Sequence, residues 1–179
     1  MKRMTIGGVE IRRVDTHVDE RGDLTEIFRQ EWDMTAQPVQ WNLVRSGANV
    51  LRGAHVHLIH HDYLLVVEGN MFVGMRDARE QSPTFGLTAE IVLSAEQLQV
   101  LVIPPGVIHG FYFTHPASYV CGVSRYWDTA DELGCLWSDL ALEIHWPCQS
   151  PILSKRDREQ PSLTQLTEAL RRYSSSFVH

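Results

Sequence analysis

The sequence predicts an all-β domain, either a sandwich or a barrel, followed by one short helix. Turn-forming residues recur at short intervals, as in Ser46-Gly47-Ala48-Asn49 and Pro104-Pro105-Gly106. Between these turns lie short segments that alternate apolar and polar residues or run apolar. Many short strands at a spacing of roughly 8–12 residues are typical of sandwiches and barrels rather than of alternating strands and helices.

The individual elements follow from this pattern in chain order. The clearest strand candidates are 9–14, 24–28, 39–44, 51–57, 63–67, 71–75, 89–93, 98–103 and 119–123. Helical spacing appears only near the C-terminus, in the apolar positions Leu163, Leu166, Leu170 and Tyr173. Ser162 stands just before them and is a suitable N-cap. We therefore expect a single β domain over residues 1–179 with a C-terminal helix.

Composition excludes several classes of protein. The net charge of −6 argues against a nucleic-acid partner held by a basic face. No apolar run approaches the ~20 residues of a membrane span, and the first six residues lack the apolar stretch of a signal peptide. The three cysteines form no CxxC pair and are expected to be reduced. We therefore expect a cytoplasmic protein without a membrane partner.

The distribution of histidines is uneven. The chain has nine, and His55, His57, His60 and His61 all fall in the segment 55–61. This is either chance clustering in a loop, or a metal site, or an acid/base site. On a strand over 51–57, His55 and His57 point to the same face, whereas His60 and His61 are expected to be solvated in the turn that follows.

Two segments carry polar residues at fixed spacing, namely His55, His57, Asp62 and Gly69 in the first and Pro104, Gly106 and His109 in the second. This arrangement resembles the two metal motifs of the cupin superfamily, with Asp62 where Glu is usual. The resemblance implies a divalent metal (Zn, Fe, Ni or Mn) bound by His55, His57, Asp62 and His109. Without a metal, His57 and Asp62 form a hydrogen-bonded pair, and His55 and His109 are polar residues of the barrel interior.

A second resemblance extends over most of the chain. It rests on a series of short segments in order: 19–22 (Asp-Glu-Arg-Gly), 26–28, 40–42, 51–55 (Leu-Arg-Gly-Ala-His), 82–86, 103–111, 146–147, 153–157 and 161–163. Together they resemble the dTDP-4-dehydrorhamnose 3,5-epimerase family, a branch of the cupins. The resemblance implies a cupin jelly-roll barrel, no required cofactor, and a homodimer in which an N-terminal strand crosses to the partner.

The family resemblance also implies an activity, the epimerisation of a nucleoside-diphosphate 4-keto-6-deoxyhexose at C3, C5 or both. The ketone acidifies the neighbouring ring protons, so that a base removes one and an acid returns a proton on the opposite face. By position in the motifs, the base is His55, oriented by Asp157. The implied substrate-binding residues are Arg21, Glu26, Gln40, Asn42, Arg52, His109 and Phe111.

Two family positions are changed. The Lys that would stabilise the enolate is Asp62, and the Tyr that serves as the acid is Val120. Tyr119 would point to the other face of the strand unless a bulge intervenes, so the identity of the acid stays open, and Tyr126 is the tyrosine kept as a catalytic candidate. A metal could replace the lost Lys as a Lewis acid. His55 cannot both bind that metal and accept a proton, so a metal would leave the base to Tyr126, Tyr112 or metal-bound hydroxide, with Asp157 as a partner behind His55.

Two other functions remain open at this point. One is a metal-dependent cupin enzyme of another class, an isomerase or an oxygenase, and the other is a non-catalytic cupin that binds a nucleotide sugar. The sequence also leaves open the nucleotide, the number of inverted centres, and whether the deoxysugar enters a surface polysaccharide or a glycosylated natural product.

Overall fold

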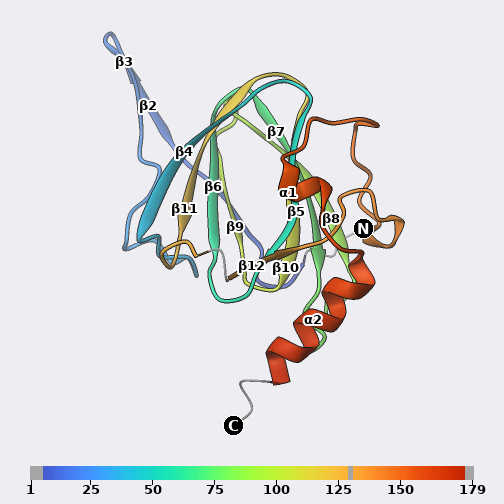
Figure 1. The fold of residues 1–179 in the computed structure, drawn as a ribbon. Coiled ribbons are helices and arrows are strands. Elements are labelled where there is room, and N and C mark those ends of the chain that lie inside the picture. Colours follow the sequence, from blue (N-terminus) through green and yellow to red (C-terminus); the bar gives the residue numbers. More distant parts are fainter. Residues whose placement is uncertain (1–5, 129–130, 176–179) are drawn as a thin grey trace, which may run out of the picture.

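Two five-stranded antiparallel sheets face each other and form the barrel (Figure 1). The computed structural model describes residues 6–128 and 131–175. One sheet has the strand order β1-β9-β6-β11-β4 and the other β12-β5-β10-β7-β8. Their strands are β1 (Glu10–Arg13), β4 (Gln40–Ser46), β5 (Val50–His57), β6 (Asp62–Glu68), β7 (Asn70–Asp77), β8 (Thr88–Ser94), β9 (Gln99–Ile103), β10 (Val107–Phe113), β11 (Ala117–Val123) and β12 (Glu132–Gly134).

The core lies between the two sheets. Strand β6 shows how the sequence builds it, because its alternate residues Leu64 and Val66 point into the barrel and join the main apolar cluster. Tyr63 and Leu65 point outward, yet they are also buried, under the segment that carries Met34. Both faces of β6 are therefore covered, which explains why its sequence runs apolar rather than alternating.

The C-terminal residues form the expected helix, α2 (Leu163–Ser175). Ser162 Oγ accepts a hydrogen bond from the backbone N–H of Gln165 at 3.3 Å, and Gln165 Oε1 accepts one from the Ser162 N–H at 3.0 Å. This reciprocal pair is a capping box. Leu163 and Leu166 are buried against the barrel. The predicted helix, its start and its apolar face are confirmed.

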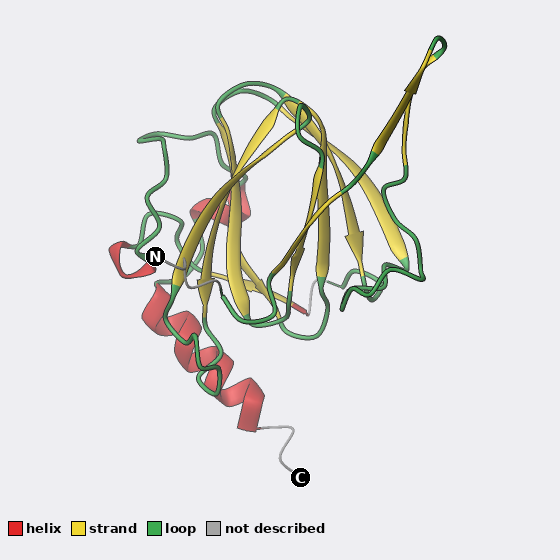
Figure 2. Ribbon diagram, turned by 180° about the vertical axis from the view of Figure 1, so that it is seen from behind, coloured by secondary structure: helices red, strands yellow, loops and turns green. Residues whose placement is uncertain are grey.

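Some elements differ from the prediction. The strand expected over 24–28 is shorter: β3 (Gly22–Thr25) pairs only with β2 (Thr16–Asp19), and this hairpin projects from the barrel (Figures 1 and 2). The sequence did not predict strand β10, which follows the Pro104-Pro105-Gly106 turn. Two short helices, η2 (Leu140–Leu142) and α1 (Lys155–Arg158), were also not predicted.

Strands β5 and β10 approach closely beside two of the candidate histidines. Gly53 has a φ of +135°, and a Cβ atom there would lie 2.6 Å from Gly110 Cα. Only glycine tolerates both that backbone conformation and that contact. Since His55 and His109 are directly paired across these strands, the two glycines allow the two imidazoles to share one face of the sheet.

Among the described residues, no helix is both long and apolar enough to cross a membrane. Residues 1–5, on which part of the signal-peptide expectation rests, lie outside the described part of the chain.

Candidate active site

His55 is held between two carboxylates. Its Nε2 atom lies 2.6 Å from Asp157 Oδ1, and its Nδ1 atom lies 3.1 Å from Glu132 Oε1. Asp157 comes from α1, where its backbone N–H donates to Ser154 Oγ at 3.0 Å, and Glu132 comes from β12. The three side chains are mostly shielded from solvent, with exposed fractions of 18%, 6% and 8% for His55, Asp157 and Glu132.

Both carboxylates are stabilised in their ionised form. Burial by itself would raise the pKa of Asp157, but the hydrogen bond and charge of His55 outweigh it, so the pKa lies below its usual value. The pKa of Glu132 is lowered in the same way, against burial, by His55 and by Arg156. His55 therefore lies between two ionised carboxylates.

A second cluster is centred on Asp62, at the start of β6. The Nε2 atoms of His57, His60 and His109 lie 3.3, 3.6 and 3.0 Å from the Asp62 carboxylate. All four side chains are buried, with residue exposures of 9%, 1%, 4% and 4% for His57, His60, Asp62 and His109. Although burial alone would raise it, these imidazoles hold the pKa of Asp62 well below its usual range.

Asp131 fixes the turn that carries His60. Its Oδ1 atom accepts hydrogen bonds from the backbone N–H groups of Leu58 at 2.7 Å and Ile59 at 2.9 Å, and its Oδ2 atom faces His60 Nδ1 at 2.5 Å. The expectation that His60 is solvated was wrong, because these three contacts fold the turn back and bury the ring. Burial alone would lower the pKa of His60, but Asp62 and Asp131 together raise it.

The structure therefore assembles a different set of side chains from the predicted metal ligands. It brings His57, Asp62 and His109 together as expected, but with His60 in the place predicted for His55. Both ring nitrogens of His55 instead face the carboxylates of Asp157 and Glu132. His55 therefore lies outside the Asp62 cluster.

An aromatic and polar wall lies beside these clusters. Phe111 is paired with Arg52 across β10 and β5, and its ring contacts those of His109 (5.5 Å between centroids) and Tyr119 (5.8 Å). Arg52 Nε donates to Ser46 Oγ at 2.9 Å. On β4, Gln40 Nε2 donates to Asn42 Oδ1 at 3.1 Å, and Asn42 is paired with Cys121 of β11.

Strand β11 places Tyr119 inside the barrel. The register of β11 against β6 shifts between Ser118 and Tyr119. Tyr119 belongs to the interior cluster, whereas Val120 packs on the outer face. Burial raises the pKa of the Tyr119 phenol, so it remains a protonated donor at neutral pH. Tyr119 and Val120 lie on opposite faces, as strand parity requires, and β11 pairs with β4 without a register shift. It is therefore Tyr119, and not the residue at position 120, that faces the interior.

Three predicted residues lie away from this wall. Tyr126 is 78% exposed, beyond the end of β11. Arg21 is at the tip of the β2–β3 hairpin, where its guanidinium pairs with Asp19 and is 84% exposed. Glu26 follows β3 and pairs with Arg29 at 3.3 Å. Within one chain, none of these three is recorded in contact with His55 or with the Asp62 cluster.

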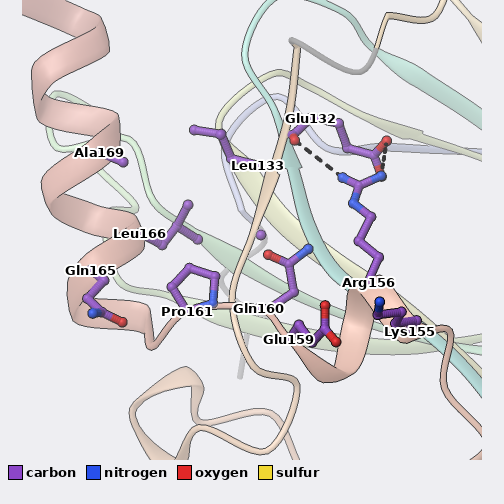
Figure 3. A pocket seen from close by; sticks show the side chains of 11 residues that line it. Glu132, Leu133, Lys155, Arg156, Glu159, Gln160, Pro161, Gln165, Leu166 and Ala169 are labelled. Carbon is purple, nitrogen blue, oxygen red and sulfur yellow. Dashed lines mark hydrogen bonds and ion pairs between the residues drawn. The ribbon is translucent and has the colours of Figure 1, made fainter.

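A cleft of about 780 Å³ lies between β12, α1 and α2 (Figure 3). On one wall Arg156 donates to Glu132, with Nη1 3.0 Å from Oε2 and Nη2 3.3 Å from the backbone oxygen. Trp127 Nε1 also donates to Glu132 Oε2, at 3.1 Å. The Glu132 carboxylate is therefore fixed from the cleft side while its other oxygen meets His55.

Sequence reasoning missed Glu132, Asp131 and His60 as parts of the site. For the two acidic residues nothing in the local pattern gives a signal, because each contacts a residue more than 70 positions away in the chain. For His60, the available signal was its place three residues after His57, across a turn.

Comparison with known proteins identifies the kind of molecule. A structure of dTDP-6-deoxy-D-glucose-3,5-epimerase from Legionella pneumophila, in complex with dTDP-4-keto-L-rhamnose, superposes with a TM-score of 0.84 at 30% identity over 93% of this chain and 94% of that one. ChmJ, a 3'-monoepimerase from Streptomyces bikiniensis in complex with dTDP-quinovose, gives a TM-score of 0.81 at 27% identity over 96% and 100% of the two chains. The fold is the cupin jelly roll and the class of enzyme is an isomerase, as predicted.

The sequence comparisons define the family. The family model described as dTDP-4-dehydrorhamnose 3,5-epimerase matches residues 3–165. The dTDP-4-dehydrorhamnose 3,5-epimerase of Shigella flexneri is 37% identical over 148 residues, 78% of this chain and 82% of that protein. The chain belongs to the dTDP-4-dehydrorhamnose 3,5-epimerase family, whose members require no cofactor. The predicted function, an epimerase of a nucleoside-diphosphate 4-keto-6-deoxyhexose, is confirmed at this level.

Proposed function

We propose that this protein epimerises a dTDP-linked 4-keto-6-deoxyhexose with His55 as the base. The observation that carries the proposal is the 2.6 Å contact between His55 Nε2 and Asp157 Oδ1, on an imidazole that is 18% exposed. A carboxylate at that distance fixes the ring and stabilises the imidazolium that forms when His55 removes a proton next to the ketone. Because Asp157 holds Nε2, the nitrogen that takes the substrate proton is Nδ1, and the substrate displaces Glu132 Oε1, which lies 3.1 Å from that nitrogen in this structure.

Tyr119 is the proposed acid. Its phenol is protonated at neutral pH. Tyr119 lies on β11, in the sheet opposite the one that contains β5. Its ring contacts that of Phe111, which in turn contacts the ring of His109, and His109 is paired with His55. Inversion requires a donor on the face away from the base. Among the tyrosines that the sequence considered, Tyr119 has the buried, inward position that this role needs, whereas Tyr126 is 78% exposed.

The negatively charged nucleotide needs local positive charge in an acidic protein. Arg52 lies next to Phe111 and Tyr119, and its planar guanidinium suits the oxygens of a pyrophosphate. The related structures from Legionella pneumophila and Streptomyces bikiniensis hold dTDP-sugars, which favours dTDP as the carrier here. Gln40, Asn42 and Phe111 are the proposed neutral contacts of the substrate.

The active unit is proposed to be a cytoplasmic homodimer. The β2–β3 hairpin extends from the barrel with Val18 and Leu24 exposed at 77% and 62% (Figure 2). Apolar residues on a projecting hairpin favour packing against a second copy. In such a dimer the hairpin of one chain would deliver Arg21 and Glu26 to the site of the other, which accounts for their distance from His55 within one chain.

The experiment is turnover of dTDP-4-keto-6-deoxy-D-glucose followed by NMR, with chelator present and absent. The proposal predicts conversion to products inverted at C3, C5 or both, and the coupling constants give the number of inverted centres. Binding of the nucleotide sugar without any conversion would instead identify a non-catalytic binding protein. Oxidised products formed only with added metal would identify a metal-dependent cupin enzyme of another class.

A further inference from the structure

Two acceptors outside the Asp62 cluster determine which ring nitrogen of His109 and of His60 carries the proton. His109 Nδ1 lies 3.0 Å from the carbonyl oxygen of Val107, and His60 Nδ1 lies 2.5 Å from an oxygen of Asp131. A carbonyl or a carboxylate only accepts, so each Nδ1 atom must carry the proton. In the neutral rings, both Nε2 atoms therefore present lone pairs.

Those lone pairs point at a negative charge. Nε2 of His109 lies 3.0 Å from Asp62 Oδ2, and Nε2 of His60 lies 3.6 Å from Asp62 Oδ1. Nε2 of His60 and Nδ1 of His57 have no hydrogen-bond partner among the described residues, and both atoms are buried. A metal ion among these atoms would give the buried Nε2 of His60 the partner that it lacks.

We infer that His57, His60 and Asp62 form a binding site for a divalent transition metal, with Zn²⁺ as the best fit. One ligand atom of each residue lies within 4.8 Å of the other two, and the Nε2 atoms of His57 and His60 lie 3.3 and 3.6 Å from the Asp62 carboxylate. Neighbouring ligands of a tetrahedral Zn²⁺ are roughly 3.3 Å apart. Two imidazoles and one carboxylate, with a fourth position left open, are a donor set that suits zinc. Asp131, behind His60, is the outer acceptor that a metal-binding histidine requires.

This site differs from the one that the sequence predicts, because it contains His60 and neither His55 nor His109. The difference resolves the conflict over His55, which keeps its place between Asp157 and Glu132 while a cation occupies the neighbouring cluster. His57 follows His55 by two residues on β5, so the cation would be held by the strand that carries the base. The role of the cation, unlike its binding, rests on the proposed epimerase function. In that reaction the cation would supply positive charge near the enolate, which Asp62 by itself would repel.

Metal binding is tested on untagged protein that has been stripped with chelator and then titrated with Zn²⁺ in a calorimeter. The site predicts saturation at about one Zn²⁺ per chain, and replacement by Co²⁺ should give the visible absorption of a tetrahedral complex. Asp131→Asn should weaken Zn²⁺ binding by about 10–100-fold. Absence of saturable binding to the wild-type chain overturns the inference.

Variants separate this site from its alternatives. His60→Ala should lose Zn²⁺ binding, whereas His61→Ala, a change of the adjacent and only half-buried histidine, should keep it. Asp62→Asn, which is nearly isosteric, should also lose it and serves where His60→Ala does not fold. His55→Asn should bind Zn²⁺ as the wild type does while losing epimerase activity, so failure of the metal site and failure of the proposed function give different results. Equal binding by His60→Ala and wild type, or loss of binding in His55→Asn, contradicts the inference.

Discussion

Asp157 Oδ1 lies 2.6 Å from His55 Nε2, although the two residues are 102 positions apart in the chain. The contact depends on α1, a four-residue helix whose N-cap Ser154 holds the Asp157 backbone in place. The base of the proposed reaction is thus positioned by a helix that lies outside both sheets, so small changes in α1 should affect chemistry more than stability.

Replacing Asp157 by Asn tests this relationship. The amide cannot stabilise the imidazolium, so the turnover number for epimerisation should fall by about 10²–10⁴-fold with little change in KM. The matched control is Glu159→Gln, which removes an exposed carboxylate next to the same helix and should leave turnover unchanged. Equal activity of Asp157→Asn and Glu159→Gln would show that Asp157 has no part in the reaction.

Tyr119→Phe separates proton removal from proton return. Without the phenol, His55 still removes a proton, but the proton comes back on the same face. Exchange of substrate hydrogen with solvent should therefore continue while the yield of inverted product per exchange falls by about 10-fold or more. NMR of the substrate and products in D₂O measures both quantities. Tyr126→Phe, at a position 78% exposed, should behave as wild type, and a reversed result would return the role of acid to Tyr126.

Complementation between two inactive variants tests the crossed dimer. Arg21→Ala and His55→Asn should each be weakly active or inactive alone. If the hairpin crosses, a re-equilibrated equal mixture contains hybrid dimers in which one site has both native residues, so about a quarter of wild-type activity should return. Size-exclusion chromatography reports the dimer in the same samples. A mixture no more active than its components would place Arg21 outside the partner's site.

The free energy of unfolding should depend on pH through the carboxylate of Asp77. It is fully buried and accepts bonds from Arg79 at 2.8 and 2.7 Å, from Ser82 at 2.7 Å and from Thr84 at 2.6 Å. Burial alone would raise the pKa of Asp77, but these bonds lower it to about 2. Because the native pKa lies below the unfolded value near 3.8, the stabilisation is complete above pH 4 and is lost as the pH falls towards 2. It amounts to about 2 kcal/mol.

Urea unfolding between pH 7 and pH 2.5 measures this contribution. Asp77→Asn should be less stable than wild type at pH 7 and should lose less stability on acidification. Asp23→Asn, on the exposed hairpin, serves as the control and should match wild type throughout. Parallel pH curves for Asp77→Asn and wild type would contradict the assignment.

Local sequence patterns predict most of the barrel strands and the C-terminal helix. Short apolar segments between turns predict β6 and β11, the Ser162 cap predicts α2, and the Leu-Arg-Gly-Ala-His segment locates His55. Local sequence patterns do not predict the burial of a side chain that depends on a contact with a residue far away in the chain. His60 is buried because Asp131, 71 positions away, holds its turn.

Tyr119 shows a different limit. Strand parity predicts that Tyr119 and Val120 lie on opposite faces, but it does not say which of the two faces inward. The packing of the sheets decides this, because Tyr119 joins the interior cluster and Val120 the outer one.

The measurement that tests the account most directly is deuterium incorporation from D₂O into dTDP-4-keto-6-deoxy-D-glucose by wild type and His55→Asn. We predict that the wild type exchanges hydrogen at one or both carbons beside the ketone and that His55→Asn shows no enzymatic exchange. The control His145→Asn, at an exposed histidine paired with Glu90, should exchange as the wild type does. A wild type that exchanges neither hydrogen, or a His55→Asn variant that exchanges them at the wild-type rate, would contradict the assignment of His55 as the base.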